Sequence, residues 1–247
     1  MRFIFLLLLL MSSAYAKDIT LTSENTVSLF GPVDRGSIGE VMHELNRLSQ
    51  IGKKEDPIYL ILYTPGGSVM AGLELINYMN TLRRPVHSVA VFAASMGFHI
   101  LENSPVRYVT KYATVMSHRA AGGFEGDIPQ QVSSRLNHVI QLVDKMDEQV
   151  IARTNGKFNK KAYLELIRDE YWVVGDNTIK DGFADEVASL KCDDSLNGTT
   201  EKNFAMGPFM IRARVSKCPL ITAPITDKEE DAREIRRLVN TVKNLEM

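Results

Sequence analysis

Two polar residues that follow apolar stretches have the side chains needed for nucleophilic catalysis. Ser95 lies in the segment Ala93-Ala94-Ser95-Met96-Gly97, after the strand pattern of residues 86–92 and before a short helix pattern. A serine at a strand-to-helix turn can present its hydroxyl at the end of a sheet, although capping a helix is the commoner use of such a serine. His118 follows a second strand pattern, residues 113–117, and imidazole is the usual base for a serine nucleophile.

The backbone at a pair of glycines could stabilise the negative charge that forms on a substrate oxygen during such catalysis. Gly66 and Gly67 lie between the apolar run of residues 58–63 and a helix pattern that extends to about Arg83. Glycine lets the backbone approach a ligand closely, and N–H groups at a helix N-terminus favour negative charge. This arrangement suits an oxyanion hole, although Pro-Gly-Gly is also an ordinary turn. The other histidines lie in predicted helices or near a strand start: His43, His87, His99 and His138.

Alternating strand and helix patterns position these residues. The predicted strands are residues 26–30, 58–63, 86–92, 106–109 and 113–117, and the predicted helices begin at Ser37, after Gly67, after Ser95, at Val132 and at Asn159. Ser37 and Glu40 have the spacing of a capping box. Residues 132–151 follow the helical period most closely of all. The alternation predicts an α/β fold with right-handed crossovers.

Composition limits the classes of function. The 247 residues are 45% hydrophobic and 24% charged, which is typical of a globular protein with a substantial core. The formal net charge is −1 at pH 7, so the basic surface expected of a nucleic-acid-binding protein is missing. We therefore expect no nucleic-acid partner.

The first sixteen residues have the features of a secretory signal peptide. Arg2 is their only charge, residues 3–11 are apolar, and Ala14-Tyr15-Ala16 is a small-x-small cleavage signal. The apolar run is much shorter than the roughly 20 residues that span a bilayer, so a retained anchor is the weaker alternative. We expect a mature chain that begins at Lys17 and a periplasmic or secreted location.

The C-terminal third contains both cysteines. In an oxidising compartment Cys192 and Cys218 can form a disulfide, and two free thiols are the alternative. Their spacing matches no zinc or redox motif, and we expect neither a metal nor a cofactor. Residues 191–247 are therefore predicted to be an extension, irregular from Cys192 to Pro224 and ending in a helix capped by Thr226. Asn197-Gly198-Thr199 formally matches a glycosylation signal.

Residues 30 to about 189 resemble the proteolytic subunit of the Clp protease, often called ClpP. The matching segments, in the order of the family, are Gly31-Pro32-Val33-Asp34, Tyr59 to Gly67, Ala93-Ala94-Ser95-Met96-Gly97, Met116-Ser117-His118 and Asp181-Gly182-Phe183-Ala184-Asp185. The resemblance implies a ClpP/crotonase-type α/β fold of repeated strand-strand-helix units for residues 17–190. It also implies a handle-like helix at residues 132–151.

The resemblance also assigns roles to the candidate residues. Ser95 would be the nucleophile and His118 the general base of a serine-type endopeptidase that works through an acyl-enzyme. The backbone N–H groups of Gly67 and Met96, with Gly66 beside them, would form the oxyanion hole.

The sequence offers two candidates for the third member of the triad. Counting back from Gly182, the position of the family's aspartate falls on Glu170, and Asp169 is adjacent. A glutamate could orient the imidazole and stabilise its charged form. We expect Glu170 in this role, with Asp169 as the second candidate.

The resemblance further implies a homo-oligomeric ring, or two stacked rings, joined through the handle. The N-terminus of this sequence departs from the family in a way that alters the expected partners. Only about nine residues would separate Lys17 from the first predicted strand. Export would also remove the protein from ATP. We therefore expect no ATPase partner, and substrates that are peptides or already unfolded proteins.

Three other interpretations compete with an active ClpP-like peptidase. A crotonase-type enzyme would use the glycine turn for acyl-thioester chemistry without the serine and histidine. A signal-peptide-peptidase-like enzyme would use a serine–lysine dyad, with Lys111 or Lys161 as its base. A catalytically silent ring would bind peptides as a scaffold.

Overall fold

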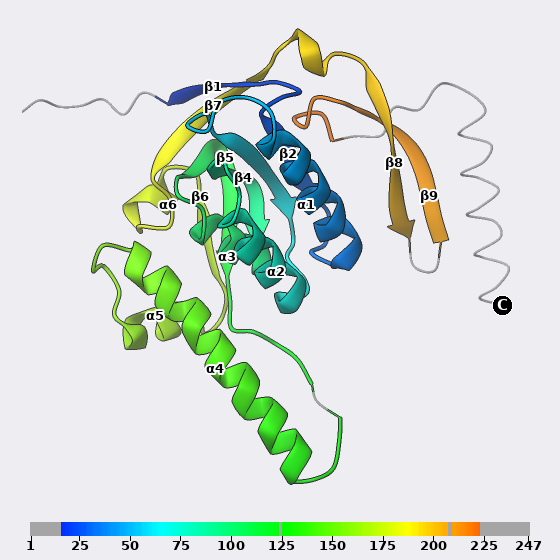
Figure 1. Cartoon of the computed structure of the whole chain (residues 1–247). Helices are drawn as coiled ribbons and strands as arrows, with labels where there is room; N and C mark the ends of the chain where they lie inside the picture. The colour runs from blue at the N-terminus through cyan, green and yellow to red at the C-terminus, as the bar shows by residue number, and fades with distance from the viewer. Residues whose placement is uncertain (1–15, 124, 207–208, 223–247) are drawn as a thin grey trace, which may run out of the picture. The chain divides into compact units, whose positions relative to one another are not determined.

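A mostly parallel sheet forms the centre of the protein. The computed structural model describes residues 16–123, 125–206 and 209–222 (Figure 1). The strand order is β1-β7-β5-β4-β3-β2, and β6 pairs antiparallel with the end of β5. The strands are β1 (Lys17–Leu21), β2 (Thr26–Phe30), β3 (Ile58–Thr64), β4 (Val86–Ala94), β5 (Arg107–Ser117), β6 (Tyr171–Val174) and β7 (Glu186–Cys192). The α/β fold class predicted from the sequence is confirmed.

Three helices connect the parallel strands. They are α1 (Arg35–Ser49), α2 (Val69–Met79) and α3 (Met96–Glu102). Strands β2 to β5 are neighbours in sequence order, and right-handed crossovers between such strands put every connecting helix on the same side of the sheet. Figure 1 shows the three helices side by side on that side. Because the strands run parallel, β3, β4 and β5 all end at the same edge of the sheet.

The first helix begins earlier than the sequence predicted. Asp34, and not Ser37, is the N-cap: the Asp34 carboxylate accepts from the N–H of Ser37 at 2.9 Å, and the Ser37 hydroxyl accepts from the N–H of Asp34 at 3.1 Å. Ser37 therefore takes the third helical position of the capping box. The prediction that Ser37 and Glu40 form this box is wrong, since the preceding aspartate is the better placed acceptor.

Two predicted strands are one strand in the structure. Strand β5 runs through the polar stretch at residues 110–112, where its pairing with β4 skips from Val109 to Thr114. The irregularity leaves Lys111 and Tyr112 exposed, which is why the sequence pattern resembled a break. Such a bulge bends the strand without ending it.

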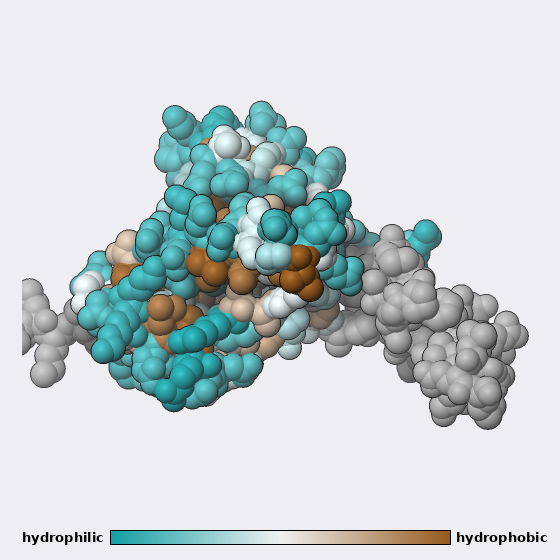
Figure 2. Space-filling view, turned by 90° about the horizontal axis from the view of Figure 1, so that it is seen from below, coloured by the Kyte–Doolittle hydropathy of each residue, from teal (hydrophilic) through white to brown (hydrophobic). Residues whose placement is uncertain are grey.

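The long helix α4 (Gln130–Arg153) is buried only near its C-terminal end. Met146 and Val150 pack into the core, whereas Leu136 and Ile140 are 45% and 49% exposed. Helix α4 lies at the bottom of Figure 1, and Figure 2 shows patches of hydrophobic side chains exposed on the face seen from below. Two shorter helices follow, α5 (Lys160–Leu166) and α6 (Asn177–Lys180). None of the helices in the described ranges is long and apolar enough to cross a membrane.

The chain divides into two compact units. Residues 24–190, with the described residues up to Ile19, form the first, and Thr20–Ser23 belong with the residues from Lys191 onward. Strand β1 occupies Lys17–Leu21, so the expectation that the first strand begins at Thr26 is wrong. The sequence did not indicate β1 because its exposed polar residues Lys17, Asp18 and Thr20 leave only two buried apolar positions. The predicted signal peptide lies outside the described residues apart from Ala16.

The second unit contains a hairpin where the sequence predicted irregular structure. Strand β8 (Thr199–Met206) pairs antiparallel with β9 (Phe209–Ser216) after a short 3-10 helix, Asp194–Leu196. The prediction failed because the largely polar residues 199–203 lack the apolar run by which strands were recognised. The predicted helix capped by Thr226 falls outside the described residues.

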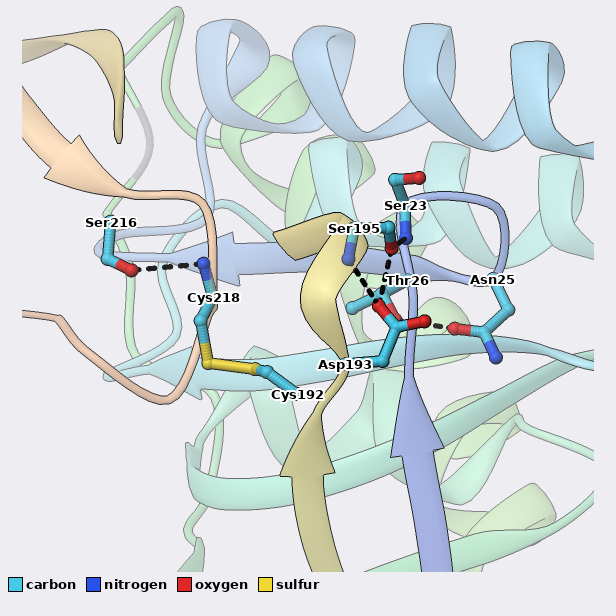
Figure 3. Close-up of a disulfide and its surroundings, with 8 residues drawn as sticks. All are labelled: Ser23, Asn25, Thr26, Cys192, Asp193, Ser195, Ser216 and Cys218. Atoms are coloured by element: carbon cyan, nitrogen blue, oxygen red, sulfur yellow. Dashed lines mark hydrogen bonds between the residues drawn. A yellow bond between two sulfur atoms is a disulfide. The ribbon is translucent and has the colours of Figure 1, made fainter. Parts of the chain in front are cut away.

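A disulfide joins the segment before this hairpin to the segment after it. Figure 3 shows Cys192 bonded to Cys218, whose N–H donates to the Ser216 hydroxyl at 3.1 Å. Nearby, Ser195 Oγ accepts from the N–H of Ser23 at 2.9 Å. Cross-linking two residues 26 positions apart stabilises the folded chain by about 3.5 kcal/mol in the loop-closure estimate.

Candidate active site

Ser95 and His118 are in direct contact. The Nε2 atom of His118 lies 2.7 Å from the Ser95 hydroxyl oxygen. Ser95 ends the connection from β4 to α3, and His118 is the residue after β5. Both side chains are partly accessible, so a substrate can reach them. The distance fits a base that removes the proton of a nucleophile.

The backbone of Ser95, the residue in contact with His118, has a strained conformation. Its φ of 54° and ψ of −117° lie outside the usual regions for a residue with a side chain. The Ser95 side chain makes no capping hydrogen bond to α3, so the ordinary use of a helix-start serine does not apply here. The turn is held by hydrogen bonds on both sides, from Ser95 N to Met116 O at 2.9 Å and from Phe98 N to Ser95 O at 3.0 Å. Strain of this kind costs roughly 1–3 kcal/mol and is concentrated at functional sites.

The glycine turn packs directly against this serine. Gly66 has a φ of +90°, and a Cβ atom there would lie 2.6 Å from the Cβ of Ser95 and 2.8 Å from the N of Met96. At Gly67, whose φ is +146°, a Cβ would lie 2.4 Å from the carbonyl oxygen of Val33. Both positions therefore require glycine, for the backbone conformation and for the space.

Two N–H groups beside Ser95 have the placement of an oxyanion hole. Val33 bonds to the carbonyl of Gly66 and to the N–H of Ser68, so the intervening Gly67 directs its own N–H to the other side. Met96 is the first residue of α3, where an N–H has no partner within the helix. Within the described ranges neither of these N–H groups has a hydrogen-bond acceptor. They remain available for a negatively charged oxygen.

The carboxylates predicted as the third member of the triad are bonded elsewhere. Strand pairing sets Ser117 opposite Tyr171, and Glu170 precedes Tyr171 with a φ of 70°, outside the extended strand conformation. The Glu170 carboxylate instead accepts from Trp172 Nε1 at 3.0 Å. Asp169 is bonded to Arg168 at 2.9 Å and is exposed. The structure gives His118 no hydrogen bond to either carboxylate.

A second imidazole lies buried close to the pair. His99 is only 8% exposed, and its Nδ1 has no hydrogen-bond partner among the described residues. Burial, together with the charge of His118, lowers the pKa of His99 to about 4. His99 therefore stays neutral at physiological pH and adds no positive charge beside the site.

The alternatives based on other residues have less structural support. Lys111 lies over the ring of Tyr112, 5.2 Å from its centroid, and Lys161 is exposed. Neither lysine makes a hydrogen bond to Ser95 within the described ranges. The same ranges contain no cluster of histidine, cysteine or acidic side chains that could hold a metal ion.

One buried polar pair next to the site was missed by the sequence reasoning. The hydroxyl of Ser117 lies 2.9 Å from the hydroxyl of Tyr163. The only sequence signal was a polar residue at a strand position that is otherwise apolar. Its partner is 46 residues further along the chain, and spacing alone does not connect them.

Comparisons with known proteins agree with the geometry. The model of the Clp protease family matches residues 11–191. The ATP-dependent Clp protease proteolytic subunit of Streptococcus pyogenes serotype M5 (strain Manfredo) is 31% identical over 171 residues, covering 68% of this chain and 86% of that protein. The subunit of the same name from Streptococcus equi subsp. equi (strain 4047) gives the same identity and coverage.

Replacing Gly66 with alanine tests whether the glycine turn belongs to the site. The added Cβ meets Ser95 and Met96 and requires a strained φ, so we expect the rate of Ser95 labelling by a fluorophosphonate to fall by about 100-fold or more. Gly39→Ala is the matched control, because a Cβ at Gly39 in α1 meets nothing within 4 Å. Equal labelling of a folded Gly66→Ala variant and the wild type would show that this turn does not shape the site.

Proposed function

The chain belongs to the Clp protease family, whose members are serine peptidases, and on this premise we propose that it is an exported serine endopeptidase with Ser95 as nucleophile. The observation that carries the proposal is the 2.7 Å contact between Ser95 and His118. It occurs at a strained turn where the serine has no capping role. The proposed substrates are peptides and already unfolded proteins.

The geometry supports acyl-enzyme chemistry in two steps. In the first step, Ser95 Oγ attacks the carbonyl carbon of the scissile peptide bond while His118 Nε2 takes the hydroxyl proton. The N–H groups of Gly67 and Met96 stabilise the oxyanion, and His118 returns the proton to the departing amine. In the second step, a water that loses its proton to His118 attacks the acyl-enzyme, which releases the acid and restores the serine.

We assign the third position to Glu170, which directly precedes β6, the strand that pairs with the end of β5. Its side chain would have to leave the indole of Trp172 to reach the imidazole. The present contact favours a second candidate function, a silent peptide-binding scaffold, because an imidazole without a carboxylate is a poorer base. Asp169, bonded to its neighbour Arg168, is the weaker candidate for the third position.

Labelling with a fluorophosphonate probe separates an active peptidase from a silent scaffold. We expect the folded mature protein to be labelled, and labelling to be lost in Ser95→Ala and reduced by about 1000-fold in His118→Ala, since the alcohol is a weak nucleophile without its base. The readout is the covalent mass increase at Ser95. A folded wild type that does not react would favour the scaffold.

The same assay compares the two carboxylates. Glu170→Gln keeps the size of the side chain and removes its charge, so it should slow labelling strongly if Glu170 supports the charged form of His118. Asp169→Asn is the matched control and should react like the wild type. The opposite ranking would transfer the role to Asp169.

We propose that the protein works in the periplasm or outside the cell, without an ATPase. The leader-like residues 1–16 support this, and so does the disulfide, which is typical of oxidising compartments. Cleavage after Ala16 would leave β1 at the start of the mature chain, with no longer segment to engage an unfoldase. The relatives named above are called ATP-dependent, and this chain would differ from them.

Protein isolated from its natural host tests the location and the ATP requirement together. We expect an intact mass that corresponds to a chain starting at Lys17 with Cys192 and Cys218 oxidised. This material should degrade a denatured protein without ATP and leave the folded form of the same protein intact, since nothing unfolds it. An uncleaved leader, or degradation only with ATP and an added unfoldase, would refute this part of the proposal.

We also propose that the protein assembles into a homo-oligomeric ring, or two stacked rings, through α4. The exposed apolar side chains of Leu136 and Ile140 support this, because contiguous exposed apolar surface often marks an interface. Leu136→Glu with Ile140→Glu should shift the mass in solution to a smaller species, as measured by light scattering. Gln141→Glu adds charge at an exposed polar position of the same helix and should leave the mass unchanged. An unchanged mass for the double variant would exclude this interface.

A further inference from the structure

The residues on both sides of His118 are tied to neighbouring residues of α5. Ser117 Oγ lies 2.9 Å from the hydroxyl of Tyr163. Arg119 donates from Nη2 to the carbonyl oxygen of Leu164 at 3.1 Å. Two hydrogen bonds from adjacent residues of one helix therefore bracket the proposed base. Neither bond involves the imidazole itself, so their effect on it is through the backbone.

The first of these bonds is buried completely. Ser117 is 1% exposed and Tyr163 is 0% exposed. The ring of Tyr163 packs in the core against Phe183, with 6.3 Å between the ring centroids. Two hydroxyls in such surroundings satisfy each other, and either one alone would be a buried polar group without a partner. A pair of apolar side chains could fill the same space, so packing alone does not require the hydroxyls.

The restraint lies next to an exposed stretch of the chain. His118 is followed by Arg119 to Gly126, whose described residues are all exposed. The chain that follows His118 therefore has few packing contacts. On the other side, β5 ends at Ser117. The position of Ser117 therefore determines where the backbone of His118 and its imidazole are placed.

Helix α5 is held by contacts at both of its ends, so its residues can restrain the end of β5. Its N-cap, Asn159, accepts from Ala162 N at 2.9 Å, and Lys160 pairs with Asp144 of α4 at 3.0 Å. At its end, Ile167 N bonds to the carbonyl of Tyr163 at 3.1 Å, and the Ile167 side chain is buried.

We infer that Tyr163 is a positioning residue for the base: through Ser117 its hydroxyl fixes the end of β5 so that His118 Nε2 points at Ser95. The bond from Arg119 to α5 supports the same geometry from the exposed side. This inference rests on the proposed function, since it matters for catalysis only if His118 is the base. It explains how the imidazole meets Ser95 although neither Glu170 nor Asp169 is bonded to it.

A pair of substitutions separates positioning from stability. Tyr163→Phe and Ser117→Ala each leave one buried hydroxyl without its partner and should lower stability. The double variant removes both hydroxyls and should recover most of the thermal stability, because no polar group is left unpaired. We expect the double variant nevertheless to react with the fluorophosphonate about tenfold more slowly than the wild type. The loss should appear in the maximal rate and not in the apparent affinity for the probe.

Tyr108→Phe is the matched control, since it removes the hydroxyl of another tyrosine, a residue of β5 at the other end of the strand. It should react at the wild-type rate. A folded double variant that also reacts at the wild-type rate would overturn the inference while leaving the proposed function intact.

An unreactive wild type would refute the proposed function instead, and the inference would then be judged by NMR. The imidazole signals of His118 should shift or broaden in the double variant and stay unchanged in Tyr108→Phe. Unchanged His118 signals in the double variant would show that the buried pair does not position the imidazole, whatever the activity.

Discussion

The strained turn at Ser95 is the constraint on which the site depends. A residue with a side chain is held at a φ of 54°, which is tolerable only because the surroundings fix it. A Cβ on Gly97 would lie 2.5 Å from the side chain of Thr64, so α3 begins in close contact with the end of β3. This contact puts the glycine turn and Ser95 at one edge of the sheet. The parallel order of β3, β4 and β5 then brings His118 to the same edge.

Orientation and charge stabilisation of the imidazole are separate in this structure. In a serine–histidine–acid triad, one carboxylate supplies both. Here Glu170 is bonded to Trp172, and the hydrogen bonds next to His118 run to α5. Backbone restraints can aim the ring, but they cannot compensate the positive charge that it gains as it removes the proton. In the proposed mechanism, His118 is already aligned with Ser95, and the Glu170 carboxylate would have to leave Trp172 to stabilise the charged imidazole.

The sequence identified the parts of the site that depend on local order. Ser95 and Gly67 lie in short motifs whose residue types are set by backbone conformation, so their placement at strand ends could be predicted. The orientation of the Glu170 side chain could not be predicted, because it depends on a hydrogen bond from the indole of Trp172. The buried bond between Ser117 and Tyr163 was missed for a different reason, since it joins residues that only the tertiary fold brings together.

Errors in the predicted fold have a similar origin. The apolar runs of β3 and β4 are buried on both faces and were recognised directly. The hairpin of β8 and β9 has few buried residues among those described, with Val215 as one of them, so its sequence resembles a loop. This unit contains both cysteines of the chain, and their disulfide constrains it covalently.

The oxyanion donors also limit which substrates the site can accept. Both proposed donors, at Gly67 and Met96, are backbone N–H groups just after the ends of β3 and β4, so the scissile carbonyl of a substrate would have to reach these strand ends. A peptide bond inside a folded protein is already hydrogen-bonded and packed, and unfolding it costs several kcal/mol or more. Without a source of ATP-driven work, the enzyme would depend on substrates that have lost their structure by other means. Short peptides and chains that are damaged or misfolded meet that requirement.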